Sequence, residues 1–179
     1  IVVMPYGNPL AKIAEQTGKD KPADVMTRDG EDALKRMKLF ETDMVGHVIP
    51  FIENKYRIIR NRNNRAIGGF SRGGGQTLRV AFNNADKFSY VCSYASYISP
   101  TEMDKSFQNI TLNPEKTNKD FKLLFSGIGT EDFLYKGTVE WENYLKEKKI
   151  NFKSYVTDGG HTWMNVKKYL NETIPLLFR

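Results

Sequence analysis

A serine in the middle of the chain lies in a pattern that is typical of a catalytic nucleophile. Ser71 is the third residue of Gly69-Phe70-Ser71-Arg72-Gly73, a G-x-S-x-G sequence that follows a predicted strand and precedes a predicted helix. Such a tight turn strains the serine backbone and exposes its hydroxyl at the helix N-terminus. There the backbone N–H of Arg72 and the helix dipole can stabilise the oxyanion that forms when the hydroxyl attacks a carbonyl carbon.

Two other roles are open for this glycine-rich turn. It could cradle a phosphate group, but it has neither the Lys-Ser/Thr of a P-loop nor the G-x-G-x-x-G spacing of a dinucleotide site. Alternatively, the glycines serve only close packing, and Ser71 caps the following helix. The nucleophile is the stronger prediction, because the motif falls at the strand-to-helix junction that the chemistry requires.

A serine nucleophile needs a base that removes its proton, and the chain offers His47 and His161. His47 lies inside a long predicted amphipathic helix, where a helix-surface or partly buried histidine is the more ordinary role. His161 follows the last predicted strand, after Gly159 and Gly160, in a turn that frees the imidazole to reach across the strand ends. We therefore predict that His161 is the base.

The base in turn needs a carboxylate that orients it, and Asp132 is the candidate. It follows a predicted strand at the carboxyl edge of the sheet, where the sites of α/β proteins gather, and Glu131 is its neighbouring rival. The order Ser71, Asp132, His161 along the chain is that of the α/β-hydrolases. Asp132 and His161 could also be ordinary turn residues, but all three groups at successive strand ends favour a triad.

A metal site is a weaker alternative. Asp158 and His161 could offer two ligands, but no further histidine or cysteine lies near them, and Cys92 is the only cysteine. The single cysteine also excludes an internal disulfide. We expect neither a metal nor any other cofactor.

Short apolar runs alternate with stretches of helical period, which predicts an α/β fold with a mostly parallel sheet. A long helix is predicted from Met37 to Ile52, with a kink or an early last turn at Pro50. Residues 8–30 and 99–120 are polar without sustained periodicity, so both are predicted to be loops. The predicted strands are residues 1–4, 66–70, 90–93, 123–126 and 152–156.

Composition limits the class of protein. The chain has 179 residues, of which 40% are apolar and 27% charged, so it has enough apolar residues for one globular domain and is neither disordered nor fibrous. No apolar run approaches the ~20 residues that span a bilayer, and we expect no membrane segment. A net charge of +6 is common on ordinary surfaces, so we expect no nucleic-acid partner.

Four blocks spread over nearly the whole chain resemble carbohydrate esterase family 1. They are IVVMPYGN (residues 1–8), RAIGGFSRGG (65–74), GTEDF (129–133) and GGHTW (159–163). That family holds feruloyl esterases, acetyl xylan esterases and relatives of the enterochelin esterases. The resemblance implies that residues 1–179 form the C-terminal two-thirds of an α/β-hydrolase esterase domain. It also implies that Ser71, Asp132 and His161 are the triad.

The resemblance also implies a serine carboxylic ester hydrolase, with a feruloyl ester of plant cell-wall polysaccharide as the expected substrate. Acetylated xylan and siderophore esters are the close alternatives. Trp163, Phe133 or Tyr135 could line the apolar slot that ferulate needs. An enzyme of plant polymers has to be exported, so the expected location is secreted or periplasmic.

Two departures from the family pattern matter. Arg72 stands where members usually carry Met, which places a guanidinium beside the site. The family's opening strands and the loop with the second oxyanion donor precede the block at residues 1–8, so we expect an upstream segment, or another chain, to complete the sheet. A non-catalytic carbohydrate-binding module is the rival interpretation, in which basic residues would contact an acidic glycan: Lys55, Arg57, Arg60, Arg62 and Arg65.

Overall fold

The structure, a computed structural model, describes residues 1–5, 7 and 31–179. The chain divides into two compact units, an N-terminal unit (Ile1–Ile58) and a C-terminal unit (Ile59–Arg179). The predicted loop at residues 8–30 lies outside the described residues, and a single domain over residues 1–179 stays a prediction. None of the described helices is long and apolar enough to cross a bilayer.

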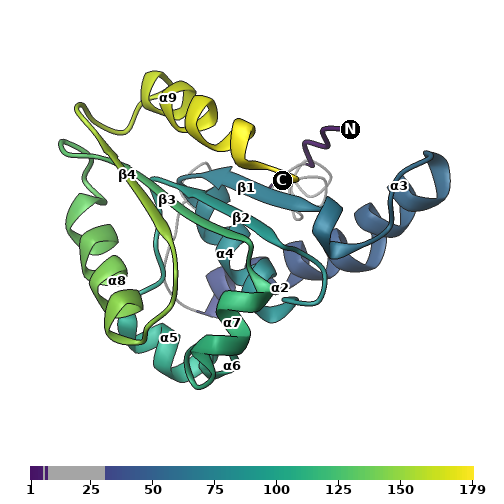
Figure 1. Cartoon of the computed structure of the whole chain (residues 1–179), viewed down its shortest axis with the longest axis horizontal. Helices are drawn as coiled ribbons and strands as arrows, with labels where there is room; N and C mark the ends of the chain where they lie inside the picture. The colour runs from purple at the N-terminus through teal and green to yellow at the C-terminus, as the bar shows by residue number, and fades with distance from the viewer. Residues whose placement is uncertain (6, 8–30) are drawn as a thin grey trace. The chain divides into compact units, whose positions relative to one another are not determined.

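A parallel sheet of four strands in the order β1-β2-β3-β4 forms the centre of the C-terminal unit (Figure 1). The two inner strands are almost entirely buried, as expected for a sheet that helices cover on both faces. All four strands predicted within this unit are confirmed, with ends that differ by at most a few residues. The strands are β1 (Ala66–Phe70), β2 (Tyr90–Tyr94), β3 (Leu123–Gly129) and β4 (Lys153–Thr157).

Helices cover both faces of this sheet (Figure 1). Every strand-to-strand connection moves the chain in the same direction across the sheet, and right-handed crossovers therefore place the connecting helices on one face. The last helix follows β4 and lies on the other side, where the ring of Tyr169 fills the space beside Gly127 of β3. The connecting helices are α4 (Arg72–Asn83), α5 (Pro100–Ser106), α6 (Gln108–Thr111), α7 (Pro114–Asp120) and α8 (Tyr135–Glu147), and the last are α9 (Trp163–Thr173) and η3 (Ile174–Leu176).

The core under α9 is aromatic. Cys92, Tyr94, Phe125 and Tyr169 are buried against one another, and the Tyr94 and Thr173 hydroxyls share a hydrogen bond of 2.7 Å that joins β2 to α9. Burial raises the pKa of the Cys92 thiol to about 12, so this thiol stays protonated at neutral pH. Cys92 is therefore a small apolar core residue rather than a reactive one.

The prediction of a loop over residues 99–120 is wrong, because three short helices, α5 to α7, occupy most of it. Two of them have capped starts. Ser99 Oγ accepts a hydrogen bond from the Glu102 N–H, and Asn113 Oδ1 accepts one from the Lys116 N–H. Pro100 and Pro114 follow these caps at the first helical position, where the missing N–H costs nothing. Caps and prolines thus set these helices, although their sequences lack an apolar period.

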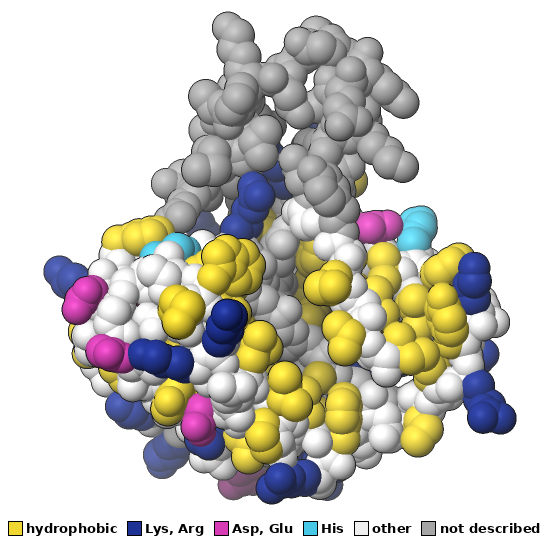
Figure 2. All heavy atoms as spheres, turned by 90° about the horizontal axis from the view of Figure 1, so that it is seen from above, with side chains coloured by type: hydrophobic (Ala, Val, Ile, Leu, Met, Phe, Trp, Pro, Cys, Tyr) yellow, Lys and Arg dark blue, Asp and Glu magenta, His cyan; other side chains and the backbone are white. Residues whose placement is uncertain are grey.

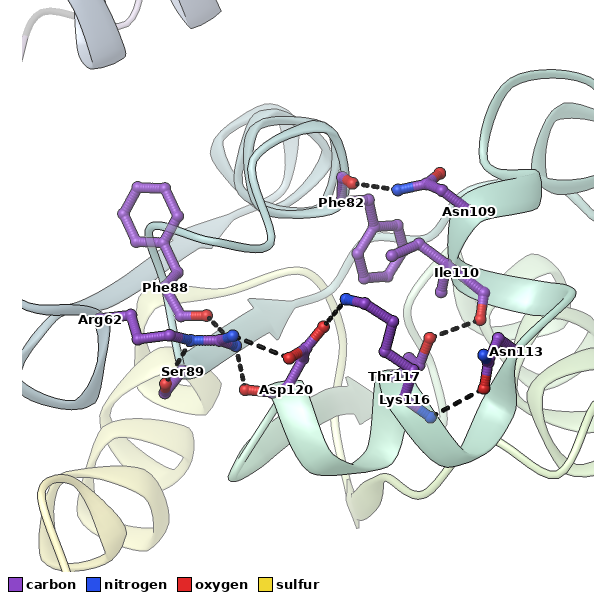
Figure 3. A network of polar contacts seen from close by, with 10 residues as sticks. All are labelled: Arg62, Phe82, Phe88, Ser89, Asn109, Ile110, Asn113, Lys116, Thr117 and Asp120. Atoms are coloured by element: carbon purple, nitrogen blue, oxygen red, sulfur yellow. Dashed lines mark hydrogen bonds and ion pairs between the residues drawn. The ribbon is translucent and has the colours of Figure 1, made fainter.

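An arginine side chain joins three segments near the start of the sheet (Figure 3). Arg62, in the short helix η2 (Arg62–Asn64), donates to Ser89 Oγ at 3.1 Å, to the Phe88 carbonyl at 3.2 Å and to Asp120 Oδ1 at 2.8 Å. Lys116 pairs with the other oxygen of the same Asp120 carboxylate. Burial acts to raise the pKa of Asp120, but the hydrogen bonds from Lys116 and Arg62 outweigh it, and the pKa lies below its ordinary value.

The N-terminal unit contains the predicted long helix, in three consecutive pieces. They are α2 (Glu31–Asp43), a π-helical turn η1 (Met44–Val48) and α3 (Ile49–Lys55). Pro50 is in the first turn of α3, directly after η1. Proline cannot donate to the preceding turn, and a widened π turn accommodates that loss. The predicted irregularity at Pro50 is therefore present, as a π turn.

The strand predicted at residues 1–4 is wrong. These residues form no strand, and their side chains Ile1, Val2, Val3 and Met4 are exposed. Their apolar, β-branched sequence suits a strand, but a strand forms only where a neighbour completes its backbone hydrogen bonds. In the part of the N-terminal unit that the structure describes, no such neighbour is present.

Candidate active site

The turn between β1 and α4 holds Ser71 in a strained conformation. Its backbone angles are φ 56° and ψ −120°, in a region that residues with a side chain rarely adopt. Its N–H donates to the Tyr94 carbonyl at 2.8 Å, which ties the turn to the end of β2. The Ser71 hydroxyl makes no capping hydrogen bond to α4, so the alternative role as a helix cap is wrong.

Glycine at two positions lets α4 approach the strands closely at this turn. A Cβ on Gly69 would lie 2.3 Å from the Gly73 carbonyl oxygen, and a Cβ on Gly74 would lie 2.7 Å from the Cβ of Ser96. Both distances are too short for any side chain. A Cβ on Gly73, by contrast, would meet nothing within 4 Å. Of the two motif glycines, it is Gly69 that the packing of the turn requires.

Asp132 lies just beyond the end of β3, and both of its carboxylate oxygens are engaged. Oδ1 accepts a hydrogen bond of 2.8 Å from the Leu134 N–H, and Oδ2 lies 2.7 Å from Nδ1 of His161. The carboxylate is almost completely buried, with 1% of the side chain exposed. Glu131, the rival carboxylate, is exposed instead. Asp132 is thus the acid that faces the histidine, as predicted.

His161 is held in the turn that joins β4 to α9. Gly159 has a φ of +81°, and its carbonyl accepts the Glu131 N–H at 3.1 Å, so the turns after β3 and β4 are bonded to each other. Because the carboxylate oxygen can only accept, Nδ1 is the donor of this hydrogen bond, and the tautomer of the neutral imidazole that fits it carries its lone pair on Nε2. This is the tautomer that a general base requires.

Aromatic rings join this pair to the serine turn. The ring of Phe70, the residue before Ser71, stacks on the imidazole of His161 with centroids 4.4 Å apart and an interplanar angle of 28°. The ring of Phe133 lies 4.7 Å from the same imidazole. Ser71 Oγ and His161 Nε2 share no hydrogen bond in the described part of the chain, and such bonds often form only when substrate is bound. The three predicted groups therefore gather at one edge of the sheet.

The other predicted site residues lie around these groups. Trp163, 71% exposed at the start of α9, has its ring 5.2 Å from that of Phe70, and Phe133 is 64% exposed. Figure 2, which views the molecule from the α9 side, shows hydrophobic side chains exposed between Lys and Arg. Tyr135 is half-buried, and its N–H donates to the Asp132 carbonyl. Arg72 is the first residue of α4, where the free N–H groups of a helix can bind an anion.

Similarity to known proteins agrees with this site. The model of the Esterase family matches residues 1–176. The chain belongs to this esterase family. Its predicted resemblance to carbohydrate esterase family 1 is confirmed, as is the α/β-hydrolase fold.

Three relatives illustrate the match. Endo-1,4-beta-xylanase Y of Acetivibrio thermocellus is 25% identical over 190 residues, which cover 92% of this chain and 18% of the xylanase. The structure of a ferulic acid esterase is 26% identical, with a TM-score of 0.64 over 76% of this chain and 59% of its own. A family 1 ferulic acid esterase of Anaeromyces mucronatus has a TM-score of 0.67 at 19% identity, over 86% of this chain and 59% of its own, and shows the shared fold. The chain thus spans less than two thirds of each relative.

Two further residues of this candidate site are not marked by any of the motifs. Phe70 occupies a variable position of the serine motif, so nothing marks its ring as a contact of the histidine. Asn165 is buried in the first turn of α9 and donates from Nδ2 to the Gly160 carbonyl at 2.9 Å, beside His161. The signal for Asn165 is its spacing, because it stands three residues after the capping Thr162, at the capping-box position.

The residues of the alternative sites have other partners in this structure. Asp158, the second candidate metal ligand, pairs with Lys168, and the hydrogen bond from Lys168 holds the pKa of Asp158 below its ordinary value. Among the described residues, no group of three or more His, Cys, Asp or Glu is placed to hold a metal ion. Of the basic run, Arg62 binds Asp120 and Arg65 donates to the Lys87 carbonyl at 2.8 Å, so both have structural partners.

Proposed function

We propose that this chain is the catalytic part of a serine carboxylic ester hydrolase, in which Ser71, His161 and Asp132 act as the triad. One observation carries the proposal. The His161–Asp132 pair, 2.7 Å apart, lies against the ring of Phe70, which is the residue next to a strained and uncapped Ser71. Membership of the esterase family supports the same activity.

The proposed reaction has two halves. His161 Nε2 takes the Ser71 hydroxyl proton while Oγ bonds to the ester carbonyl carbon, and the imidazolium then gives that proton to the departing alkoxide as its C–O bond breaks. In the second half, His161 deprotonates a water that attacks the acyl-serine, and the proton returns to Ser71 Oγ as the acid leaves. Asp132 holds the Nδ1–H and stabilises the imidazolium in both halves.

The proposed oxyanion donor is the backbone N–H of Arg72 at the start of α4. Because the donor is a backbone group, arginine in place of the family's usual methionine preserves it. A second donor and a strand beside β1 would come from an upstream segment of the same polypeptide or from another chain. This part of the proposal is supported by β1, which pairs with β2 on one side and with no strand on the other among the described residues.

The proposed substrate is a feruloyl ester of plant cell-wall xylan. A ferulic acid esterase at 26% identity and a xylanase at 25% identity support this class over others. The exposed rings of Phe133, beside His161, and of Trp163, beside Phe70, give a flat aromatic group an apolar surface, and Tyr135 lies at the start of α8. Since such polymers do not enter a cell intact, we propose a secreted or periplasmic enzyme.

The test is to react the completed enzyme, which includes the segment that supplies the strand beside β1, with a fluorophosphonate and to locate the label by mass spectrometry. We expect the label on Ser71, none on the Ser71→Ala variant, and a rate of labelling that falls ~100-fold or more in His161→Gln. Release assays with methyl ferulate, acetylated xylan and a siderophore ester then separate the substrates. A protein that binds xylan but is neither labelled on Ser71 nor releases any acid would instead be a non-catalytic binding module.

A further inference from the structure

We propose that Phe70 and Phe133 are positioning residues that set the plane of the His161 imidazole. This inference rests on the proposed function of His161 as the base. It concerns two side chains that touch neither the nucleophile's oxygen nor the carboxylate in the described contacts, and that act on the reaction only through the histidine.

The hydrogen bond to Asp132 leaves one motion of the imidazole free. A bond at Nδ1 fixes that atom 2.7 Å from Oδ2, but the ring can still turn about this contact and swing Nε2 away from Ser71. A flat group against the ring face removes this freedom. The ring of Phe70, nearly parallel at 28° and 4.4 Å, is such a group. Since Phe70 is bonded to Ser71 along the chain, the contact fixes the base relative to the nucleophile.

Phe133 supplies a second ring contact with the imidazole. It follows Asp132 directly, is 64% exposed and lies 4.7 Å from the imidazole at 47°. A phenylalanine this exposed gains little from burial, and its ring lies against the imidazole of His161. The neighbours of the nucleophile and of the acid therefore both reach the same imidazole. His161 is therefore restrained by the segment that carries the nucleophile and by the segment that carries the acid.

The experiment compares leucine and tyrosine at each position. Leucine keeps the apolar character and removes the flat ring, whereas tyrosine keeps the ring. We expect kcat on methyl ferulate to fall about 10-fold in Phe133→Leu and at least as far in Phe70→Leu, with KM changed less than about 2-fold. Phe70→Tyr and Phe133→Tyr, which keep the ring, should have a kcat within about 2-fold of the parent. Phe178→Leu, at an exposed ring against Tyr90, is the matched control and should leave kcat unchanged.

A second measurement does not depend on turnover. Aromatic rings stacked on the imidazole shift its carbon-bound protons to high field in the NMR spectrum, and we expect that shift to fall in both leucine variants. This readout covers Phe70→Leu in particular, because Phe70 also packs against the core cluster and its loss could lower stability. Phe133 is 64% exposed, so Phe133→Leu should unfold within a few degrees of the parent temperature.

The outcomes separate this inference from the proposed function. If Ser71→Ala keeps full esterase activity, the proposed function fails and this inference with it. If Ser71→Ala is inactive while both leucine variants keep the parent kcat and unchanged imidazole resonances, the triad stands and the positioning role is overturned. The positioning role is also overturned if the leucine and the tyrosine variant at one position lower kcat equally, because the flat ring is then not what matters.

Discussion

Ser71 stores conformational free energy in the fold. Its positive φ costs about 1–3 kcal/mol for a residue with a Cβ and little for glycine. We expect Ser71→Gly to be more stable than Ser71→Ala by ~1 kcal/mol, since both remove the hydroxyl and only alanine keeps the strain. Urea denaturation of the two variants measures the difference. Equal stabilities would mean that the turn relaxes when the hydroxyl is removed.

At Gly69, the surrounding backbone leaves no room for a side chain. A Cβ there would lie 2.3 Å from the Gly73 carbonyl oxygen, so Gly69→Ala must push α4 away from β1. We expect a loss of ~2 kcal/mol or more in the free energy of unfolding. The control is Gly73→Ala, where the space is open and alanine favours the helix by up to ~1 kcal/mol. Thermal unfolding compares the two, and the prediction is wrong if they lose stability equally.

At the scale of elements, the short helices between β2 and β3 depend on their first residues. Asn113 Oδ1 accepts the Lys116 N–H at the start of α7, and such a cap contributes ~1 kcal/mol. We expect Asn113→Ala to lose about that much and Asn113→Asp to lose little, because aspartate caps equally well. Denaturant titration provides the values. A destabilised Asn113→Asp would assign the effect to something other than the cap.

Sequence patterns predicted the elements whose signals are local. Strands β1 to β4 are short apolar runs, and the serine turn has its own motif, so both are confirmed. Helices α5 and α7 could not be predicted from periodicity, because a cap and a proline set the start of each without an apolar stripe. The strand at residues 1–4 was predicted in error, because pairing depends on a neighbour that composition does not reveal.

In the candidate site too, some contacts could be predicted from the sequence and others could not. Asp132 and His161 could be predicted because parallel strands end at one edge of the sheet, and their 2.7 Å contact agrees with that geometry. The contact of Phe70 with His161 could not be predicted, because it depends on the orientation of two side chains that are far apart in sequence. Topology thus places residues at an edge, and packing decides which of them touch.

Across the whole molecule, the Asp120 carboxylate links α7 to η2 and to the start of β2 through Arg62 (Figure 3). Because the pKa of Asp120 is lowered in the folded state, its stabilisation is present above the unfolded pKa and is lost as pH falls through the folded value. We expect Asp120→Asn to lose ~1–3 kcal/mol at pH 7, and this loss to shrink below about pH 4. Urea denaturation at both pH values measures it.

The matched control for that prediction is Asp86→Asn. A hydrogen bond from Lys87 lowers the pKa of Asp86 as well, but the Asp86 side chain is 72% exposed. Water screens the pair, so the substitution should change stability by well under 1 kcal/mol at any pH. If the two variants behave alike, the link through Arg62 does not stabilise the fold.

Cys92, in β2, is buried under α9, and its thiol is protonated. The folded chain should therefore not react with maleimides or other thiol reagents. A cysteine introduced at an exposed position such as Lys136, on the first turn of α8 beyond Phe133, would therefore be the single site that such a reagent modifies. A fluorophore attached there would report the arrival of an ester at the neighbouring aromatic rings without any background from the rest of the polypeptide.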